Sequence, residues 1–223
     1  MDKSFAKIYK ITDREFWHEY WFYYKKHTII GVIAVILLIF TMHSCMTQVK
    51  PDFTLLFIGE TALLPETPTE PRLEQIIEDV NQDGKKSVLI YNLPLGQEKD
   101  YTTKQTSVQK ADVELGAGDP FIFVTDSVLL DRYVEMEAFE DTGALIEEAN
   151  IPEARIVRNQ EGAAVAVDMT DTEFSRFIGI TSKNKVYCGI KVRPEGKQND
   201  KTYNMYHNEA LRMYGLILNN ALE

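Results

Sequence analysis

The sequence predicts an α/β protein, with one N-terminal transmembrane helix followed by a single mixed, mainly parallel sheet flanked by helices. Three observations support this fold class. A segment without permanent charge and long enough to cross a bilayer occupies residues 28–49. Beyond it, short apolar runs typical of buried strands alternate with segments of helical periodicity, which favours a parallel sheet with right-handed crossovers. The 223 residues leave room for one sizeable domain besides the anchor.

The apolar segment is predicted to anchor the chain in membrane lipid. At about 1.5 Å per residue it reaches roughly 30 Å, which matches the hydrocarbon core. Aromatic rings and lysines, which are typical of the membrane interface, precede it. The predicted interface residues are Trp17, Tyr20, Trp21, Tyr24, Lys25 and Lys26. Residues 1–27 are therefore a predicted juxtamembrane segment, residues 28–49 the transmembrane helix and residues 50–223 the exported domain.

Charge asymmetry predicts the orientation of this anchor. Six Lys or Arg residues precede the span, whereas Lys50 is the only basic residue close behind it. The positive-inside rule then places the N-terminus in the cytoplasm and the C-terminal domain outside the cell membrane. Cleavage is the alternative, because residues 42–45 distantly resemble a lipoprotein box in which Cys45 is acylated. Met42 and His43 fit that box poorly.

The exported domain is acidic, since residues 51–223 contain 17 basic and 30 acidic residues. Such a surface repels phosphate backbones, which argues against a nucleic-acid partner. Two cysteines, Cys45 and Cys188, are too few and too distant in sequence to indicate a zinc site or a disulfide framework. Two unpaired thiols are expected, and a pair between them stays open.

Periodicity and turn residues predict the elements of the domain in order. Apolar runs predict strands over 52–59, 87–91, 121–124, 155–158, 163–167 and 186–192. Helical spacing predicts helices over 73–80, 102–115, 126–133, 139–149, 171–177 and 205–222. Glycines at 84, 116 and 118 are the expected helix stops.

Motifs that carry chemistry are weak in this chain. Residues 79–84 match the first half of a calcium-binding loop, but Ile90 occupies the twelfth position, where a bidentate Glu is needed. A helix end explains the same residues, and neither a metal nor a cofactor is predicted. His207 is the only histidine of the domain; it is expected at the surface, without a Ser/His/Asp arrangement. The sequence therefore predicts that the protein is not an enzyme.

If a small ligand binds, its expected place is at the carboxyl ends of the parallel strands, where loop backbones and helix N-termini meet. These ends comprise Gly59, Glu60, Thr61, Asn92, Thr125, Asp126 and Ser127. Residues 125–127 serve equally well as an N-cap cluster for the following helix. Both interpretations stay open.

Residues 111–126 (ADVELGAGDPFIFVTD) and 139–145 (FEDTGAL) resemble a stretch of extracytoplasmic solute-binding proteins in which a helix ends at a glycine and a strand emerges. Residues 186–192 are similar to another strand of that fold. The chain also resembles signal-anchored proteins of Gram-positive bacteria with aromatic-rich anchors. The resemblance implies one lobe, whose strand delivers groups to a sugar or peptide cleft. Phe121 replaces the Asp that follows the family's proline, and the chain is too short for two lobes.

The function expected from these features is that of a membrane-tethered extracytoplasmic binding or accessory module. Its expected partners are membrane lipid and another membrane or extracytoplasmic protein. The alternative is a degenerate solute-binding protein that holds a small ligand at the strand ends. A single lobe offers an open shelf rather than a closing cleft, which argues against high-affinity capture.

Overall fold

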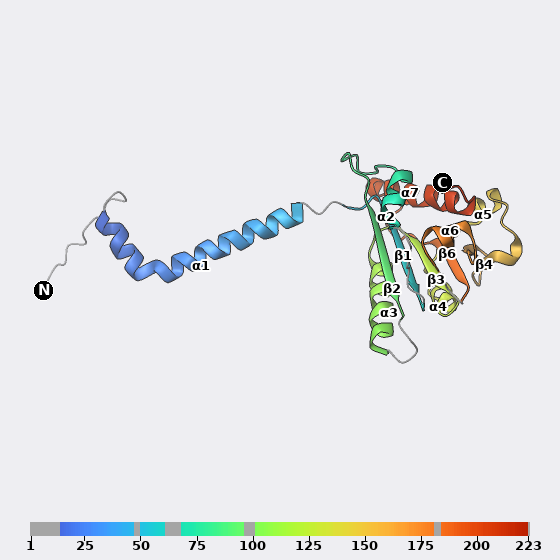
Figure 1. Cartoon of the computed structure of the whole chain (residues 1–223), viewed down its shortest axis with the longest axis horizontal. Coiled ribbons are helices and arrows are strands. Elements are labelled where there is room, and N and C mark those ends of the chain that lie inside the picture. Colours follow the sequence, from blue (N-terminus) through green and yellow to red (C-terminus); the bar gives the residue numbers. More distant parts are fainter. Residues whose placement is uncertain (1–13, 47–49, 61–67, 96–100, 181–183, 223) are drawn as a thin grey trace. The chain divides into compact units, whose positions relative to one another are not determined.

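The computed structural model describes residues 14–46, 50–60, 68–95, 101–180 and 184–222. The chain divides into two compact units, Met1–Val49 and Lys50–Glu223. Helix α1 (Arg14–Met46) is the described part of the first unit, and all other elements belong to the second (Figure 1).

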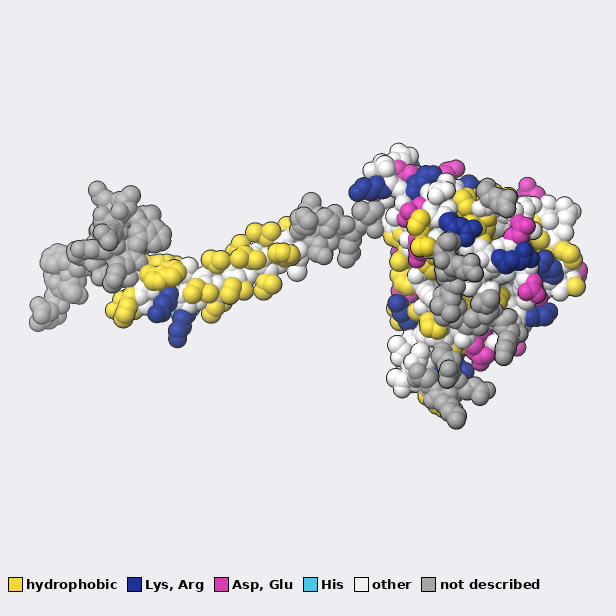
Figure 2. Space-filling model, viewed as in Figure 1, with side chains coloured by type: hydrophobic (Ala, Val, Ile, Leu, Met, Phe, Trp, Pro, Cys, Tyr) yellow, Lys and Arg dark blue, Asp and Glu magenta, His cyan; other side chains and the backbone are white. Residues whose placement is uncertain are grey.

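Helix α1 contains one segment, Tyr20–Met42, that is long and apolar enough to cross a membrane. None of its most apolar stretch is buried inside the protein, and Figure 2 shows hydrophobic side chains along the described part of the helix. A membrane anchor and a signal sequence both fit such a helix near the N-terminus. The segment starts before Thr28, because the helix continues without a break through the aromatic residues and the two lysines.

The predicted interface residues lie on α1. The rings of Tyr20 and Tyr24 stack with their centroids 5.4 Å apart, and the Thr28 hydroxyl donates to the Tyr20 hydroxyl at 3.0 Å. Trp21, Tyr24, Lys25 and Lys26 are exposed, whereas the side chain of Trp17 lies outside the described residues. Exposed rings beside an apolar stretch suit a membrane interface, and this role stays a prediction.

The domain is built on one mixed sheet with the strand order β2-β1-β3-β6-β5-β4 (Figure 1). Its strands are β1 (Phe53–Gly59), β2 (Val88–Pro94), β3 (Ile122–Asp126), β4 (Ile156–Arg158), β5 (Ala164–Asp168) and β6 (Val186–Ile190). Strand β1 pairs in parallel with β2 and β3 and so forms a parallel core, and the pairs from β3 to β4 are antiparallel. The predicted α/β class and mixed sheet are confirmed.

Helices cover both faces of the sheet. One face packs against α2 (Glu70–Ile76), α5 (Gly143–Glu148), α6 (Glu173–Phe177) and α7 (Lys201–Leu218), and the other against α3 (Tyr101–Gly116) and α4 (Leu130–Glu135). A short 3-10 helix, η1 (Glu153–Arg155), precedes β4. Successive strand side chains point to opposite faces, so Leu55 and Phe57 enter the first core and Leu56 and Ile58 the second. A strand buried on both faces explains the uninterrupted apolar run.

The predicted helix over 73–80 is shorter than expected. Helix α2 ends at Ile76, and the chain beyond it turns toward the buried carboxylate of Asp52. One oxygen of that carboxylate accepts the N–H groups of Val80 and Asn81 at 2.9 and 3.2 Å. A non-local acceptor therefore takes the backbone donors that a longer helix would bond internally.

The two helices predicted after β3 also begin later than expected. Strand β3 continues through Asp126, and α4 starts at Leu130. In the segment 139–149 only α5 is helical, because Phe139 forms a β-bridge with Lys191. Helix α7 starts before the predicted residue 205, since the Asp200 side chain accepts the Tyr203 N–H at 3.1 Å and caps the helix.

Candidate functional site

The predicted strand-end residues gather around the buried carboxylate of Asp126. Its Oδ2 accepts the backbone N–H of Glu60 at 2.7 Å, and its Oδ1 accepts the N–H of Val128 at 3.0 Å. A Cβ on Gly59 would lie 3.0 Å from Oδ2, so the glycine leaves room for the carboxylate. Asp126 therefore ties the end of β1 to the loop after β3, and both of its oxygens are used by the backbone.

Thr125, Ser127 and Glu60 surround this tie. Thr125 is fully buried, and its hydroxyl has no hydrogen-bond partner among the described residues. Ser127 is exposed, and its N–H donates to the Lys185 carbonyl at 2.9 Å. The exposed Glu60 accepts a hydrogen bond from the Asn184 side chain at 2.8 Å. The strand ends thus combine the exposed side chains of Glu60 and Ser127 with the buried hydroxyl of Thr125.

The remaining strand-end predictions fall elsewhere. Asn92 pairs in register with Phe57, whereas Gly59 pairs with Pro94, so Asn92 lies before the end of β2. Thr61 lies outside the described residues. The N-cap position of α4 is Leu129 and has no side-chain cap, so residues 125–127 do not cap this helix.

The calcium-like loop 79–84 is held by its own side chains. Asp79 Oδ2 accepts the Gly84 N–H at 2.8 Å, and Asn81 Oδ1 accepts the Asp83 N–H at 2.9 Å. Gly84 has a φ of 84°, a conformation that favours glycine. Within the part of the chain that the structure describes, no group of three or more His, Cys, Asp or Glu side chains is placed to hold a metal ion.

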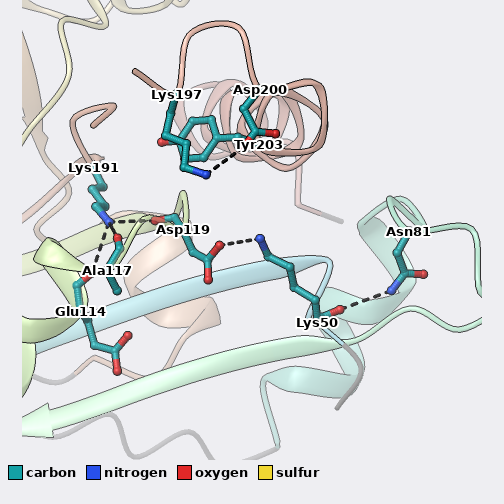
Figure 3. Close-up of polar contacts among 9 residues, drawn as sticks. All are labelled: Lys50, Asn81, Glu114, Ala117, Asp119, Lys191, Lys197, Asp200 and Tyr203. Carbon is teal, nitrogen blue, oxygen red and sulfur yellow. Dashed lines mark hydrogen bonds and ion pairs between the residues drawn. The ribbon is translucent and has the colours of Figure 1, made fainter. Parts of the chain in front are cut away.

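A buried lysine is the first polar group that the sequence analysis missed. The Lys191 ammonium donates to the carbonyl oxygens of Glu114 at 3.2 Å, Asp119 at 3.0 Å and Ala117 (Figure 3). The Lys191 side chain is completely buried, and burial lowers its pKa from 10.5 to about 8. The ammonium satisfies carbonyls at the C-terminal end of α3, where cations are favourable. A lysine inside the apolar run over 186–192 was the signal in the sequence.

His207 is the second buried polar group that the sequence analysis missed, and the expectation that it lies at the surface is wrong. Its ring is fully buried, with Nε2 2.7 Å from a Glu140 carboxylate oxygen and Nδ1 2.9 Å from Arg193. The ring also stacks on Tyr203, at 5.8 Å between centroids. Burial follows from its place on the inner face of α7, one turn after Tyr203. Cys188 is also buried, which raises the pKa of its thiol, and the side chain of Cys45 lies outside the described residues.

Strand β2 forms one edge of the sheet. The Leu95 N–H donates to the Gly59 carbonyl at 2.7 Å. By the alternation along a strand, the odd-numbered residues of β2 therefore direct their backbone N–H and C=O groups toward β1. Val88 and Ile90 then direct their backbone N–H and C=O groups away from β1. Pro94, which has no N–H, occupies an outward-facing position, as is usual in edge strands. Within the described residues, β2 pairs with no strand other than β1.

No protein-family model matches the chain, and no curated protein and no solved structure matches it either. The resemblance to one lobe of solute-binding proteins therefore stays a prediction.

Proposed function

We propose that this protein is a membrane-tethered extracytoplasmic module that binds another protein through the edge strand β2 and is not catalytic. Helix α1 is the anchor in this proposal, with the N-terminus in the cytoplasm and the acidic domain outside. The observation that carries it is the seven-residue edge strand Val88–Pro94 on a domain that follows an apolar helix.

The geometry of β2 supports this role. An edge strand presents backbone donors and acceptors to which an extended segment of a partner can add. The apolar side chain of Leu89 is 37% exposed on this strand, whereas many apolar side chains of the domain are buried in its core. The excess of acidic residues in the domain favours a partner segment that carries basic side chains.

Site-specific photo-crosslinking in the native membrane tests the proposal. A crosslinker at position 89 of the full chain is expected to give one discrete protein adduct. The same crosslinker at Val113, which is 69% exposed on α3, is the control for random neighbours. Val88→Pro removes one outward N–H at the first position of the strand, where proline is tolerated, and is expected to abolish the adduct.

An adduct that forms equally from positions 89 and 113, or that persists with Val88→Pro, contradicts docking along β2. The absence of any protein adduct at position 89 contradicts the proposed function itself.

A degenerate solute-binding protein is the second candidate. The buried Thr125 hydroxyl, which lacks a partner among the described residues beside the Asp126 tie, favours a ligand at the strand ends. Thermal-shift screening of the full chain in detergent with sugars, peptides and amino acids tests it. A shift that Asp126→Asn leaves unchanged, or no shift with any compound, removes this candidate.

A further inference from the structure

A cleft of about 150 Å³ lies at the amino ends of β1 and β2, beside the end of α3. We name it the Lys50 cleft. Its walls include the three aromatic residues Tyr91, Phe121 and Tyr206 and the three acidic residues Asp52, Glu114 and Asp119. The buried Asp52 carboxylate is already used by the backbone N–H groups of residues 80, 81 and 87. The Lys50 ammonium lies 4.4 Å from the centroid of the Tyr206 ring and pairs with the Asp119 carboxylate (Figure 3). The cleft already holds one ammonium group against a carboxylate and an aromatic face.

Cations of the chain lie near the other two rings of the cleft, since the Lys191 ammonium is 5.0 Å from the centroid of the Phe121 ring and the Lys110 ammonium 5.2 Å from that of Tyr91. The charges that act on the two tyrosines of the cleft are nevertheless negative. Burial raises the pKa of Tyr206, and the carboxylates of Asp52 and Asp119 raise it further. Burial and the neighbouring Glu114 raise the pKa of Tyr91 in the same way. Negative charge that opposes the ionisation of a tyrosine stabilises a cation at the same place. The Asp119 side chain is 63% exposed, so a second cation can reach it from solvent.

We infer that the Lys50 cleft binds the primary ammonium group of a lysine side chain from the partner protein, and that Lys50 occupies the site when the partner is absent. A carboxylate beside an aromatic face is suited to an alkylammonium group. The inference rests on the proposed function and deepens it, because Leu89 and Tyr91 of the edge strand form one wall of the cleft. A segment added along β2 would carry its side chains past this wall.

Lys50 acts in this scheme as a competitor attached to the chain. It directly precedes Pro51 and β1, so its ammonium stays near the cleft at a high effective concentration. Tethered groups reach effective concentrations of about millimolar or more, and a free ammonium must displace them. Removing the Lys50 side chain is therefore expected to tighten binding of a free lysine side chain by about tenfold.

The test is a ligand-observed NMR titration of the full chain in detergent micelles. The probe is Nα-acetyl-lysine methylamide, and its Nε-acetylated form is the matched uncharged probe. The variants are Lys50→Ala alone and together with Asp119→Asn, which removes the charge but keeps the backbone carbonyl that binds Lys191. Lys185→Ala is the control, because Lys185 pairs with Asp168 at 3.1 Å and does not line the cleft.

The expected result is a charged probe that binds Lys50→Ala about tenfold more tightly than wild type or Lys185→Ala. Adding Asp119→Asn should remove this binding, and the uncharged probe should not bind. Equal affinity for wild type and Lys50→Ala, or binding that does not require Asp119, overturns the inference.

The two proposals fail separately. Loss of probe binding with an intact crosslink from position 89 refutes the ammonium site alone. Probe binding without any protein adduct refutes the proposed function and with it the partner lysine, and leaves only the ammonium site.

Discussion

The burial of Lys191 predicts an unusual dependence of stability on pH. The Lys191 pKa is about 8 in the folded domain and 10.5 in the unfolded chain. Between these values the unfolded chain binds more protons than the folded one, so the free energy of unfolding rises with pH. At 1.36 kcal/mol for each tenfold change in proton affinity, the gain from pH 7 to pH 9.5 is about 2 kcal/mol.

Comparison with Lys191→Met isolates this contribution. Other groups also make the stability depend on pH in this range. Burial raises the pKa of the Cys188 thiol, so its contribution to the free energy of unfolding falls as pH rises above 9. These groups are common to wild type and variant, so they cancel in the difference. At pH 7 the variant is expected to lose about 3 kcal/mol, because three carbonyls lose a charged donor.

Guanidinium unfolding of the full chain in detergent, followed by near-UV circular dichroism, measures the difference. The stability gap between wild type and Lys191→Met should widen by about 2 kcal/mol from pH 7 to pH 9.5. Lys197→Met is the matched control: the half-exposed Lys197 pairs with Asp200, which raises its pKa, so the stability gap between wild type and this variant should not widen. A gap for Lys191→Met that stays constant or narrows refutes the assignment of Lys191 as a desolvated ammonium.

Three further substitutions, the first with a matched control, test the packing of the domain by the same unfolding assay. Gly59→Ala should lower the free energy of unfolding by about 1 to 3 kcal/mol, because its Cβ would lie 3.0 Å from an Asp126 carboxylate oxygen. Gly215→Ala is the control and should be neutral or stabilising, because open space surrounds Gly215. Equal changes in stability for the two variants contradict the close contact between Gly59 and Asp126. Gly189→Ala should cost more than Gly59→Ala, since its Cβ would lie 2.5 Å from a backbone oxygen, and a smaller loss contradicts that contact. His207→Phe keeps the ring but loses both hydrogen bonds, and about 2 kcal/mol is expected; an unchanged stability shows that the bond to Glu140 contributes little.

The sheet was predictable because its signals are local. Strand β1 is apolar on both faces, and a glycine ends it, so the run over 52–59 predicts nearly the observed bounds. The gathering of Gly59, Thr125 and Asp126 followed from a general rule, since parallel strands end at the same edge. The use of the Asp126 carboxylate was not predictable, because its acceptor bond to the Glu60 N–H joins residues far apart in sequence.

The helix ends were less predictable for the same reason. Residues 77–80 keep helical spacing, yet the Asp52 carboxylate takes the Val80 N–H and stops the helix. Propensity and spacing describe what a segment prefers alone, and a buried acceptor from another element overrides that preference. The capping Asp200 was, by contrast, a local signal, three residues before Tyr203, whose N–H it accepts.

His207 shows where reading a sequence by residue type fails. A single histidine looks like a surface residue when its partner is distant in sequence, and Glu140 lies 67 positions earlier in the chain. The helix period alone would have placed His207 inside, because it shares the inner face of α7 with Tyr203 and Tyr214. A polar residue on an apolar face has to find a partner or lose stability. The spacing therefore implied an acid or a carbonyl opposite His207, although only the structure could show that it is Glu140.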